Sequence, residues 1–529
     1  MNLVALLEER ARIHPERPAL IDCHQGQDRV ISFGELARKV ASGARELREI
    51  GLMPGNVVLV FQPVSIELYE ILLASFHAGL WVMLADPSAG RAFLSHCCRR
   101  LEPEAFFGSW KAQCLRLTIA EMRRIRICIS AGWFPGTRVW HTDSPGMPAV
   151  DVADDDPALV TFTSGSTGVP KAAVRSHGFL LAQHRALSKA LDFADGEVDL
   201  ITLPVFVLAN LASGLTSVLA ATDLAKPGTP DARAIRDQCD RFKVTRCAAS
   251  PAFFEGLLRS AEGMPRLEKV YTGGAPVFPD LLKRLRKVLP DACIHSVYGS
   301  TEAEPIAHFP ADDATDVSDS LTRRGGGLCS GKPVPEVRVR IIADQWGKPL
   351  GPRDIEPMAM GEAGEIMVTG DHVLRGYLDG LGDEETKVHD GKQVWHRTGD
   401  AGWLDEAGLI WLLGRCSEKL SAFPAGEGLP GNALRYPFAI ECAMREIFPE
   451  IRMAALEWNE RRALVVGWKC DAEVAARIKE HATGFGVTQV FYLDALPLDR
   501  RHNAKIDYPV LREMLKNEKP RSEEFRAGL

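Results

Sequence analysis

Short apolar runs alternate with helical patterns through the middle of the chain. Between residues 161 and 340 the strand-like runs are DLITLPVF, CAAS, LEKVYTGG and CIHSVYG. The segments between them, such as PDARAIRDQCDRFKV and PVFPDLLKRLRKVL, carry apolar residues at helical spacing. Alternating strands and helices favour parallel sheets with helices packed on their faces. We therefore expect an α/β fold in this region.

The pattern changes after residue 334. VRVRII, GEIMVTG and LIWLLG are strand-like runs interrupted by Gly and Asp, which predicts antiparallel sheet up to residue 413. Beyond Arg415 a Pro/Gly-rich loop, PAGEGLPGN, leads into a compact mixed segment. We place a domain boundary there, with residues 1–415 before it and residues 416–529 after it.

The N-terminal stretch MNLVALLEERARIHPERPALI has the apolar spacing of a short amphipathic helix and lacks the basic and apolar regions of a signal peptide. No apolar run reaches the roughly 18 residues that a membrane span needs, so none is expected. The length of 529 residues indicates at least two domains. A net charge of −7 argues against a nucleic-acid partner, although a local basic patch stays open. Twelve scattered cysteines without a Cys-x-x-Cys pair indicate reduced thiols in a cytoplasmic protein.

The segment TFTSGSTGVPK, residues 161–171, follows the apolar run ALV. Small residues let a backbone approach a ligand closely, and N–H and hydroxyl groups can surround an anion. Lys171 adds a charge that suits a phosphate. Pro170 before the lysine and Ala172 after it rule out a Walker A loop. The alternative is a flexible polar surface loop, but the hydroxyls and the closing Pro-Lys favour phosphate binding.

TFTSGSTGVPK resembles the phosphate loop of the adenylate-forming superfamily, which includes acyl-CoA synthetases, firefly luciferase and the adenylation domains of peptide synthetases. The resemblance covers nearly the whole chain, because YTGGAP, YGSTEAEP, RTGDAGWLDEAGLIWLLGR and LPLDRRHNAKID follow in the family's order. It implies that residues 1–415 form an AMP-binding domain of parallel sheets flanked by helices with a small antiparallel barrel-like part. It also implies that residues 416–529 form a small mobile α+β domain carrying the catalytic lysine. ATP and Mg²⁺ are the implied cofactors.

The resemblance implies a role for each motif. Thr301 would contact the AMP phosphate or the acyl carboxylate, and Glu302 would be the magnesium ligand, a role that a hard carboxylate oxygen suits. Lys505 would offset the charge that gathers as a carboxylate attacks phosphorus. The expected ATP- and AMP-binding residues are Thr163, Ser164, Gly165, Ser166, Thr167, Gly168, Lys171, Gly273, Gly274, Ala275, Tyr298, Gly299, Ser300, Asp400 and Arg415.

Among these residues, Tyr298 would stack on adenine, Asp400 would accept hydrogen bonds from the ribose hydroxyls and Arg415 would reach the ribose or the phosphate. Each motif also has a purely structural interpretation. A Thr-Glu pair after Gly is often the start of a helix, with Ser300 or Thr301 capping it. YTGGAP and TGD could be turns, and Lys505 could be an ordinary solvated lysine.

Several positions depart from the common family pattern. Ala504 replaces a glycine before the catalytic lysine, and Ser417 replaces an acidic hinge residue. LSAFPAGEGLPGN stands where CoA ligases have a strand that lines the thiol tunnel. LPVFVLANLASG has Val207 after Phe206, where the family has a histidine. These features resemble the β-lactone synthetases of bacterial olefin biosynthesis, in which an internal hydroxyl displaces AMP.

Three hypotheses follow. The first is ATP-dependent activation of a β-hydroxy acid through an acyl-adenylate, followed by closure to a β-lactone. The second is a fatty acyl-CoA or acyl-carrier-protein ligase, so a role for CoA is left open. The third, a non-catalytic binding protein, is disfavoured by the intact set of site residues. Phe206 and Val207 suggest an apolar acyl pocket, hence a long-chain or apolar carboxylic acid, with a pathway enzyme or carrier protein as a further partner.

Overall fold

The fold is taken from a computed structural model of the chain. It describes residues 1–24, 26–86, 89–164, 170–467, 471–498, 505–518 and 521–524. The chain divides into two compact units. The first comprises Met1–Thr222, Asp237–Cys247 and Asp371–Asp383, and the second comprises Asp223–Arg236, Ala248–Gly370 and Glu384–Leu529. Three of the five unit boundaries fall within α9 (Ala232–Phe242), β12 (Arg246–Ala249) and α13 (Asp383–Thr386).

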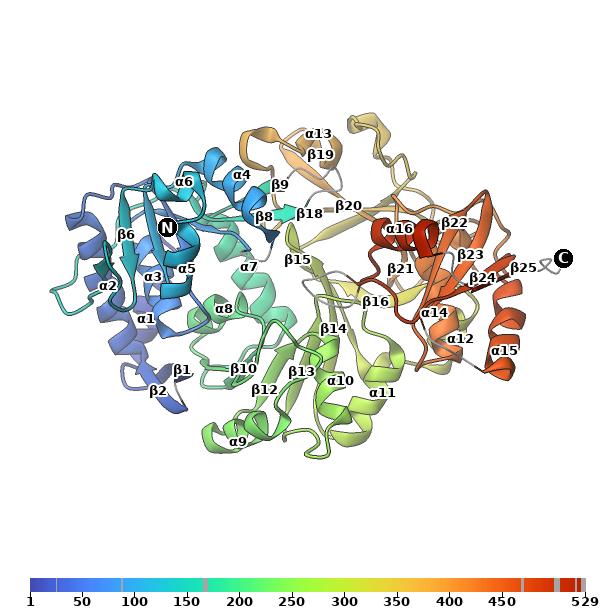
Figure 1. The fold of residues 1–529 in the computed structure, drawn as a ribbon, viewed down its shortest axis with the longest axis horizontal. Helices are drawn as coiled ribbons and strands as arrows, with labels where there is room; N and C mark the ends of the chain where they lie inside the picture. Colours follow the sequence, from blue (N-terminus) through green and yellow to red (C-terminus); the bar gives the residue numbers. More distant parts are fainter. Residues whose placement is uncertain are drawn as a thin grey trace. The chain divides into compact units, whose positions relative to one another are not determined.

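The first unit contains a mainly parallel sheet with the strand order β7-β6-β5-β3-β4-β8-β9, in which only the β8–β9 pair is antiparallel (Figure 1). Helices follow most of its strands in the chain, as parallel connections require. The strands are β3 (Val57–Phe61), β4 (Trp81–Leu84), β5 (Ala105–Gly108), β6 (Ile127–Ser130), β7 (Arg138–Val139), β8 (Pro157–Ser164) and β9 (Pro170–Ser176). The helices are α2 (Phe33–Glu49), α3 (Ile66–His77), α4 (Arg91–Leu101), α5 (Trp110–Arg116) and α6 (Ala120–Arg123).

The same unit holds the strands β10-β11-β1-β2, of which β10, β11 and β1 are parallel. They are β1 (Pro18–His24), β2 (Gln27–Ser32), β10 (Val198–Ile201) and β11 (Thr216–Leu219). The accompanying helices are α1 (Ala5–Ile13), α7 (His177–Ala190) and α8 (Phe206–Ser213). The expected N-terminal helix is therefore confirmed. The run DLITLPVF, in contrast, is a strand only as far as Ile201, because Phe206 already begins a helix.

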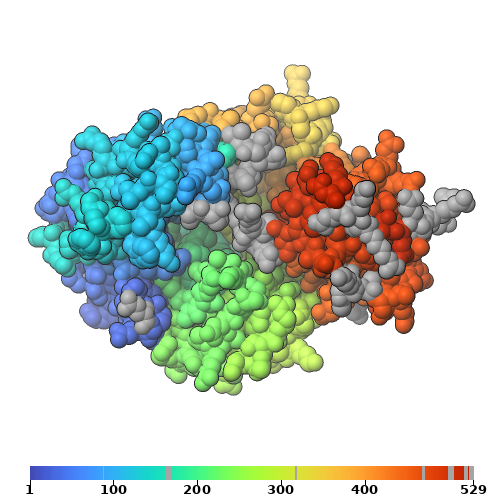
Figure 2. All heavy atoms as spheres, in the orientation of Figure 1, coloured from blue at the N-terminus to red at the C-terminus, as the bar shows by residue number. Residues whose placement is uncertain are grey.

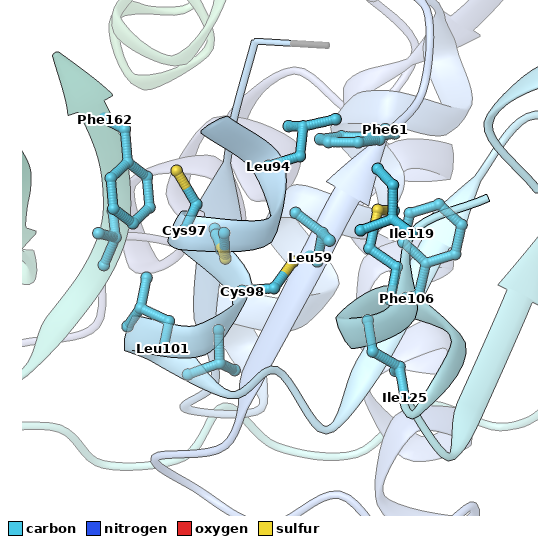
Figure 3. Close-up of a cluster of buried hydrophobic side chains, with 14 of the residues drawn as sticks. Leu59, Phe61, Leu94, Cys97, Cys98, Leu101, Phe106, Ile119, Ile125 and Phe162 are labelled. Carbon is cyan, nitrogen blue, oxygen red and sulfur yellow. The ribbon is translucent and has the colours of Figure 1, made fainter. Parts of the chain in front are cut away.

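A buried apolar cluster joins α4 to the strands of the parallel sheet (Figure 3). Cys97 and Cys98 point into it beside Leu94, Leu101 and Phe162. Burial raises the pKa of each of these two thiols to about 12, so both stay protonated at neutral pH. The adjacent cysteines therefore act as small apolar core residues.

The second unit continues from a parallel pair into antiparallel sheet, which confirms the prediction for residues 334–413. The strand order is β17-β18-β20-β21-β16-β15-β14-β13, and β19 pairs with β20. These strands are β13 (Lys269–Gly273), β14 (Cys293–Ser300), β15 (Ala303–Pro310), β16 (Leu328–Pro333), β17 (Arg338–Ile342), β18 (Gly364–Thr369), β19 (Lys387–Asp390), β20 (Gln393–Leu404) and β21 (Ile410–Arg415). The helices are α10 (Pro251–Arg259), α11 (Pro279–Val288) and α12 (Asp316–Arg323).

The C-terminal part of the second unit is a four-stranded sheet, β22-β23-β24-β25, with helices on both faces (Figure 1). Alternate residues of β22 point to opposite faces, so Ala455 packs with α14 and α15, and Leu456 packs with α16. The elements are β22 (Met453–Trp458), β23 (Arg461–Val466), β24 (Gln489–Tyr492), β25 (Arg521–Glu524), α14 (Pro437–Ile447), α15 (Ala472–Thr483) and α16 (Tyr508–Glu518). Helix α16, in dark red, lies on the surface in Figure 2.

No described helix combines the length and the apolar character needed to cross a membrane.

Candidate active site

Thr301 and Glu302 form the tip of a tight hairpin between β14 and β15. Ser300 pairs directly with Ala303 across this turn, and the antiparallel ladder continues away from it. The alternative prediction of a helix start at this point is therefore wrong. The two strands pair along their length, from Ser300–Ala303 to His295–Pro310, and this pairing overrides the local capping preference of Ser and Thr. The hairpin presents a hydroxyl and a carboxylate side by side.

Asp400 is held by two side chains, one on each side of its carboxylate. The phenolic oxygen of Tyr298 donates to Oδ2 at 2.8 Å. Nη1 of Arg415 lies 2.9 Å from Oδ1 and also donates to the carbonyl oxygen of Thr398 at 3.1 Å. Asp400 and Arg415 are direct partners across the β20–β21 ladder, which fixes their approach. The structure therefore brings together Tyr298, Asp400 and Arg415, which lie far apart in the sequence.

The backbone conformation of residues 398–400 orients the side chain of Asp400. Gly399 has φ +70°, a conformation that favours glycine, and the hydroxyl of Thr398 accepts the backbone N–H of Asp400 at 3.0 Å. The same hydroxyl donates to the carbonyl oxygen of Ile366 at 2.8 Å. These residues lie inside β20, so the alternative of a simple turn at TGD is wrong.

The surroundings of Tyr298, Asp400 and Arg415 favour a neutral phenol and a charged guanidinium beside the carboxylate. Burial, reinforced by the charge of Asp400, raises the pKa of Tyr298 well above its usual range, so the phenol stays a hydrogen-bond donor. The charge of Asp400 raises the pKa of Arg415, with smaller contributions from Tyr298 and Glu302. Glu302 is therefore close enough to the Arg415 guanidinium to act on it. The result is a carboxylate with paired oxygens beside a cation and an acidic hairpin tip.

YTGGAP lies at the end of β13, next to β14. A Cβ on Gly273 would come within 2.6 Å of the carbonyl oxygen of Val297, so only glycine fits between the two strands. Gly274 is exposed, with φ +77°, and a Cβ added there would meet nothing within 4 Å; the partly exposed Ala275 follows it. The glycines thus allow both a close strand contact and an open backbone surface, as the sequence suggests.

Two buried hydroxyls beside this surface have no hydrogen-bond partner among the described residues, those of Thr272 and Ser300. Buried polar atoms are normally paired, so such atoms suit a bound polar ligand. Together with the acceptor Asp400, the open backbone at Gly274 and the acidic Glu302, they are compatible with a nucleotide and a hard cation.

Lys171, which the sequence assigns to phosphate binding, lies in the first unit and is largely enclosed. It lies on β9 opposite Thr163 and is only 6% exposed. Its ammonium group lies 5.6 Å from the ring centroid of Tyr377. A Cβ on Gly382 would come within 2.5 Å of its side chain, so that glycine leaves the room in which the lysine packs. Tyr377 and Gly382 are not among the site residues expected from the sequence, because they lie about two hundred residues after Lys171.

The neighbouring phosphate-loop residues are only partly described. Thr163 and Ser164 end β8, which pairs with β9 up to Pro170. Gly165, Ser166, Thr167 and Gly168 lie outside the described residues. The strand before the loop and the strand after it are therefore established, and the ligand role of the loop stays a prediction.

Phe206 and Val207 begin α8 and are almost fully buried. They belong to the first unit. Lys505, in the second unit, is exposed and stands three residues before Tyr508, the first residue of α16. Its neighbour Ile506 pairs with Leu498 through an isolated bridge.

Two further contacts near Lys505 were not foreseen. Tyr508 donates to Glu441 of α14 at 2.5 Å, and Arg512 forms an ion pair with Glu418. No local sequence signal reveals either pair, because the partners are more than sixty residues apart. They fasten the helix after Lys505 to the C-terminal sheet and to the segment after Arg415.

A cluster of Asp344, Glu365 and Cys416 also has the geometry of a metal site. Its carboxylates, however, already pair with cations: Asp344 with Lys419 at 2.8 Å and Glu365 with Arg397 at 2.6 Å. Burial raises the pKa of the Cys416 thiol well above its usual range, which opposes the thiolate that a metal needs. This cluster is best described as a buried ion-pair network.

The sequence profile of the AMP-binding enzyme family matches residues 7–378. The chain belongs to this family. Membership makes it an ATP-dependent enzyme that activates a carboxylic acid as an acyl-adenylate. It is 30% identical over 548 aligned residues to an olefin β-lactone synthetase of Xanthomonas campestris, covering 96% of each chain. A protein of the same description from Stenotrophomonas maltophilia is 29% identical, again over 96% of each chain.

The fold matches solved structures of the same kind of enzyme. An o-succinylbenzoate–coenzyme A synthetase from Bacillus subtilis, solved with ATP and a magnesium ion, superposes with a TM-score of 0.74 at 21% identity. The match covers 97% of this chain and 99% of that one. The expectation of an α/β protein with a separate small C-terminal sheet is confirmed.

Proposed function

We propose that this AMP-binding enzyme converts a β-hydroxy carboxylic acid into a β-lactone through an acyl-adenylate. The observation that carries the proposal is the segment after Arg415. From residue 416 to residue 431 the chain has no helix and no strand, whereas a CoA ligase is expected to have a tunnel-lining strand there. An internal hydroxyl nucleophile needs no thiol tunnel. The similarity to the two olefin β-lactone synthetases along the whole chain supports the same conclusion.

In the first step, a carboxylate oxygen attacks the α-phosphorus of ATP and pyrophosphate leaves. Asp400, with both oxygens already oriented, accepts hydrogen bonds from the ribose hydroxyls, and Arg415 supplies positive charge beside it. Thr163, Ser164, Gly165, Ser166, Thr167, Gly168 and Lys171 hold the outer phosphates. Lys505 neutralises charge that develops on the reacting groups. Thr301 contacts the reacting phosphate or carboxylate.

Glu302 would hold Mg²⁺, which would supply further charge neutralisation on the phosphates. The base would lie against Tyr298 and the backbone of Gly273, Gly274 and Ala275, with Gly299 and Ser300 completing the contact. In the second step, the substrate's own hydroxyl oxygen attacks the acyl carbonyl, the hydroxyl loses its proton, and AMP leaves as the four-membered ring closes.

The acid is proposed to be long-chain or otherwise apolar. Phe206 and Val207 support this, because they place large apolar side chains at the start of α8 without a polar group where the family pattern has a histidine. A carrier protein or a neighbouring pathway enzyme is a proposed source of the acid or acceptor of the product.

Residues 416–529 are proposed to move as the C-terminal domain. Contacts on both sides of Ser417 support a hinge there. Cys416 donates its backbone N–H to Gly399 in the sheet that holds Asp400, at 2.9 Å. On the other side, Glu418 pairs with Arg512 of α16. Movement about such a hinge would also have to release the bonds of Lys419 and Tyr436 to Asp344 and of Arg445 to Glu255.

The test measures pyrophosphate release from ATP and Mg²⁺ with a long-chain 3-hydroxy acid, with and without CoA, and identifies the product by NMR. The proposal expects turnover without CoA and a β-lactone. The matched control is the acid of equal length without the hydroxyl, which should form an adenylate but no lactone. Turnover only with CoA, giving a thioester, would replace the proposal with the acyl-CoA ligase alternative.

A further inference from the structure

A second cluster of reactive side chains lies at the other end of β14 from the Thr301–Glu302 hairpin. Cys293, the first residue of the strand, is exposed, and His295 lies two residues later on the same strand face. The thiol sulfur is 3.1 Å from Nε2 of His295. Nδ1 of His295 is in turn 3.1 Å from Nδ1 of His308 on β15. The three side chains form a continuous chain of hydrogen bonds that starts at the surface.

Either direction of this hydrogen-bond chain favours an ionised sulfur. If His295 donates through Nδ1 to His308, its Nε2 is a base for the thiol proton, and transfer gives a thiolate beside an imidazolium. If His308 donates instead, Nε2 of His295 carries a proton and donates to the sulfur. A neutral imidazole has only one N–H, so these are the two arrangements. The order of nucleophile, base and orienting group is the one that activates cysteine.

The surroundings of the imidazoles keep them in place. The rings of His295 and His308 are stacked, with centroids 5.4 Å apart and planes inclined by 14°, and the ring of Tyr271 lies 5.6 Å from His295. Burial lowers the pKa of His308, partly opposed by Asp313, so this imidazole stays neutral and orients its neighbour.

Two basic residues flank this end of β14: Lys269 of β13, which is the direct cross-strand partner of Cys293, and Arg286 of α11. Arg286 of α11 donates to the carbonyl oxygen of Ala292 at 2.6 Å and pairs with Asp312 at 2.5 Å. The charge of the guanidinium is thus offset locally, and the imidazole of His295 lies within hydrogen-bond distance of the sulfur.

We propose that Cys293, His295 and His308 form a nucleophilic thiol site that takes small disulfides and becomes a mixed disulfide. The Cys293 sulfur attacks one sulfur of the incoming disulfide, a new S–S bond forms, and the old one breaks. The departing thiolate takes up the proton from His295. The exchange consumes one disulfide and releases one thiol, so it needs no other oxidant. This site is independent of the proposed lactone chemistry.

Two other exposed cysteines of the same chain serve as internal controls for the reactivity of Cys293. Cys23 and Cys114 are also exposed, and within the described parts of the chain their thiols have no hydrogen-bond partner. They serve as reference thiols without an imidazole partner among the described residues. Differences between these cysteines and Cys293 report the effect of the site, and substitution of His295 separates the imidazole from its other neighbours.

The experiment treats the full-length protein with oxidised glutathione between pH 6.5 and 8 and follows each cysteine by peptide mass spectrometry. At pH 6.5 Cys293 should react at least about tenfold faster than Cys23 and Cys114, with a rate nearly independent of pH. The rates of the other two should rise with pH. A Cys293 rate that rises in parallel with theirs overturns the proposal.

His295→Asn should lower the Cys293 rate to that of Cys114, and His308→Asn should lower it partly. Circular dichroism establishes that the variants are folded, and the pH profile of the unsubstituted protein decides the question if they are not. A folded His295→Asn variant with an unchanged Cys293 rate also overturns the proposal.

Discussion

The phenolic oxygen of Tyr508 lies 2.5 Å from Oε1 of Glu441, and this bond joins the helix after Lys505 to α14. The same carboxylate oxygen accepts the backbone N–H of Ala455 at 2.9 Å. Burial raises the pKa of Glu441 to about 7, and the charge of Glu418 adds to the increase. The single carboxyl of Glu441 thus links α16 to α14 and to β22 of the C-terminal sheet, and it titrates near neutral pH.

Glu441 should make the stability of the protein fall as the pH rises. Its pKa is about 7 in the folded protein and 4.5 in the unfolded chain, so between these values the folded state retains a proton that the unfolded state has lost. The stabilisation is complete below pH 4.5 and is lost as the pH rises through 7, by about 1.4 kcal/mol for each unit of pKa difference. Glu441→Gln keeps the oxygen that accepts both bonds but does not titrate.

Urea unfolding from pH 5 to pH 8 tests this expectation. As the pH rises from 5 to 8, the free energy of unfolding of the unsubstituted protein should fall relative to that of Glu441→Gln. Tyr508→Phe is the control, because losing its hydrogen bond should raise the pKa of Glu441 further and extend the dependence to higher pH. Parallel pH curves for the Gln variant and the unsubstituted protein would contradict the titration of Glu441.

Lys505→Ala should reduce adenylation by orders of magnitude while ATP binding stays largely intact. The reason is that the lysine would neutralise charge in the transition state more than in the bound ground state. Pyrophosphate release reports the first effect, and calorimetric titration with ATP reports the second. Lys516→Ala, which removes an exposed lysine of α16, should change neither. Unchanged pyrophosphate release by Lys505→Ala would remove the catalytic role.

Asp400→Asn should weaken ATP binding about ten- to hundredfold, since hydrogen bonds to a charged group contribute about 1.5–3 kcal/mol. It also removes the charge that Arg415 faces at 2.9 Å. Tyr298→Phe keeps the aromatic ring and the charge but removes the 2.8 Å hydrogen bond to Asp400, so it should weaken binding less. Equal ATP affinity in Asp400→Asn and the unsubstituted protein would rule out a ribose contact.

Glu302→Gln should raise the magnesium concentration needed for half-maximal pyrophosphate release, because an amide is a weaker ligand for a hard cation than a carboxylate. Glu406→Gln, at an exposed turn between β20 and β21, is the matched control for loss of one negative charge. If the two variants need the same Mg²⁺ concentration, Glu302 is not the metal ligand.

The local spacing of apolar residues was sufficient to predict the helices and strands that bury one face. The segments that became β13, β14, α9 and α11 show strand or helical spacing, and each forms as expected. The order of the motifs was enough to select Tyr298, Asp400 and Arg415, which the structure brings into direct contact. Pattern succeeds here because burial of apolar residues decides both the element and its face.

Sequence reasoning was less informative where distant segments decide the structure. A helix start at Thr301 is locally reasonable, but pairing of β15 with β14 makes the pair a hairpin tip. The sequence predicts a phosphate-binding role for Lys171 but does not show that Tyr377 and Gly382, about two hundred residues later, enclose its side chain. The bond between Tyr508 and Glu441 likewise spans two elements that no sequence spacing relates.

The enclosure of Lys171 gives a prediction with a matched control. Gly382 and Gly51 both adopt positive φ, +102° and +100°, so alanine strains the backbone similarly at either position. At Gly51 an added Cβ meets nothing within 4 Å, whereas at Gly382 it comes within 2.5 Å of the Lys171 side chain. Both variants should lose comparable stability, on the order of 1 kcal/mol, in urea unfolding.

Only Gly382→Ala should also weaken ATP binding and slow pyrophosphate release, because it moves the lysine proposed to face the phosphates. Calorimetric titration with ATP separates the two variants, and Lys171→Ala sets the size of the largest effect. If Gly382→Ala and Gly51→Ala bind ATP equally well, the position of Lys171 against Gly382 has no part in phosphate binding, and the lysine's buried packing is structural.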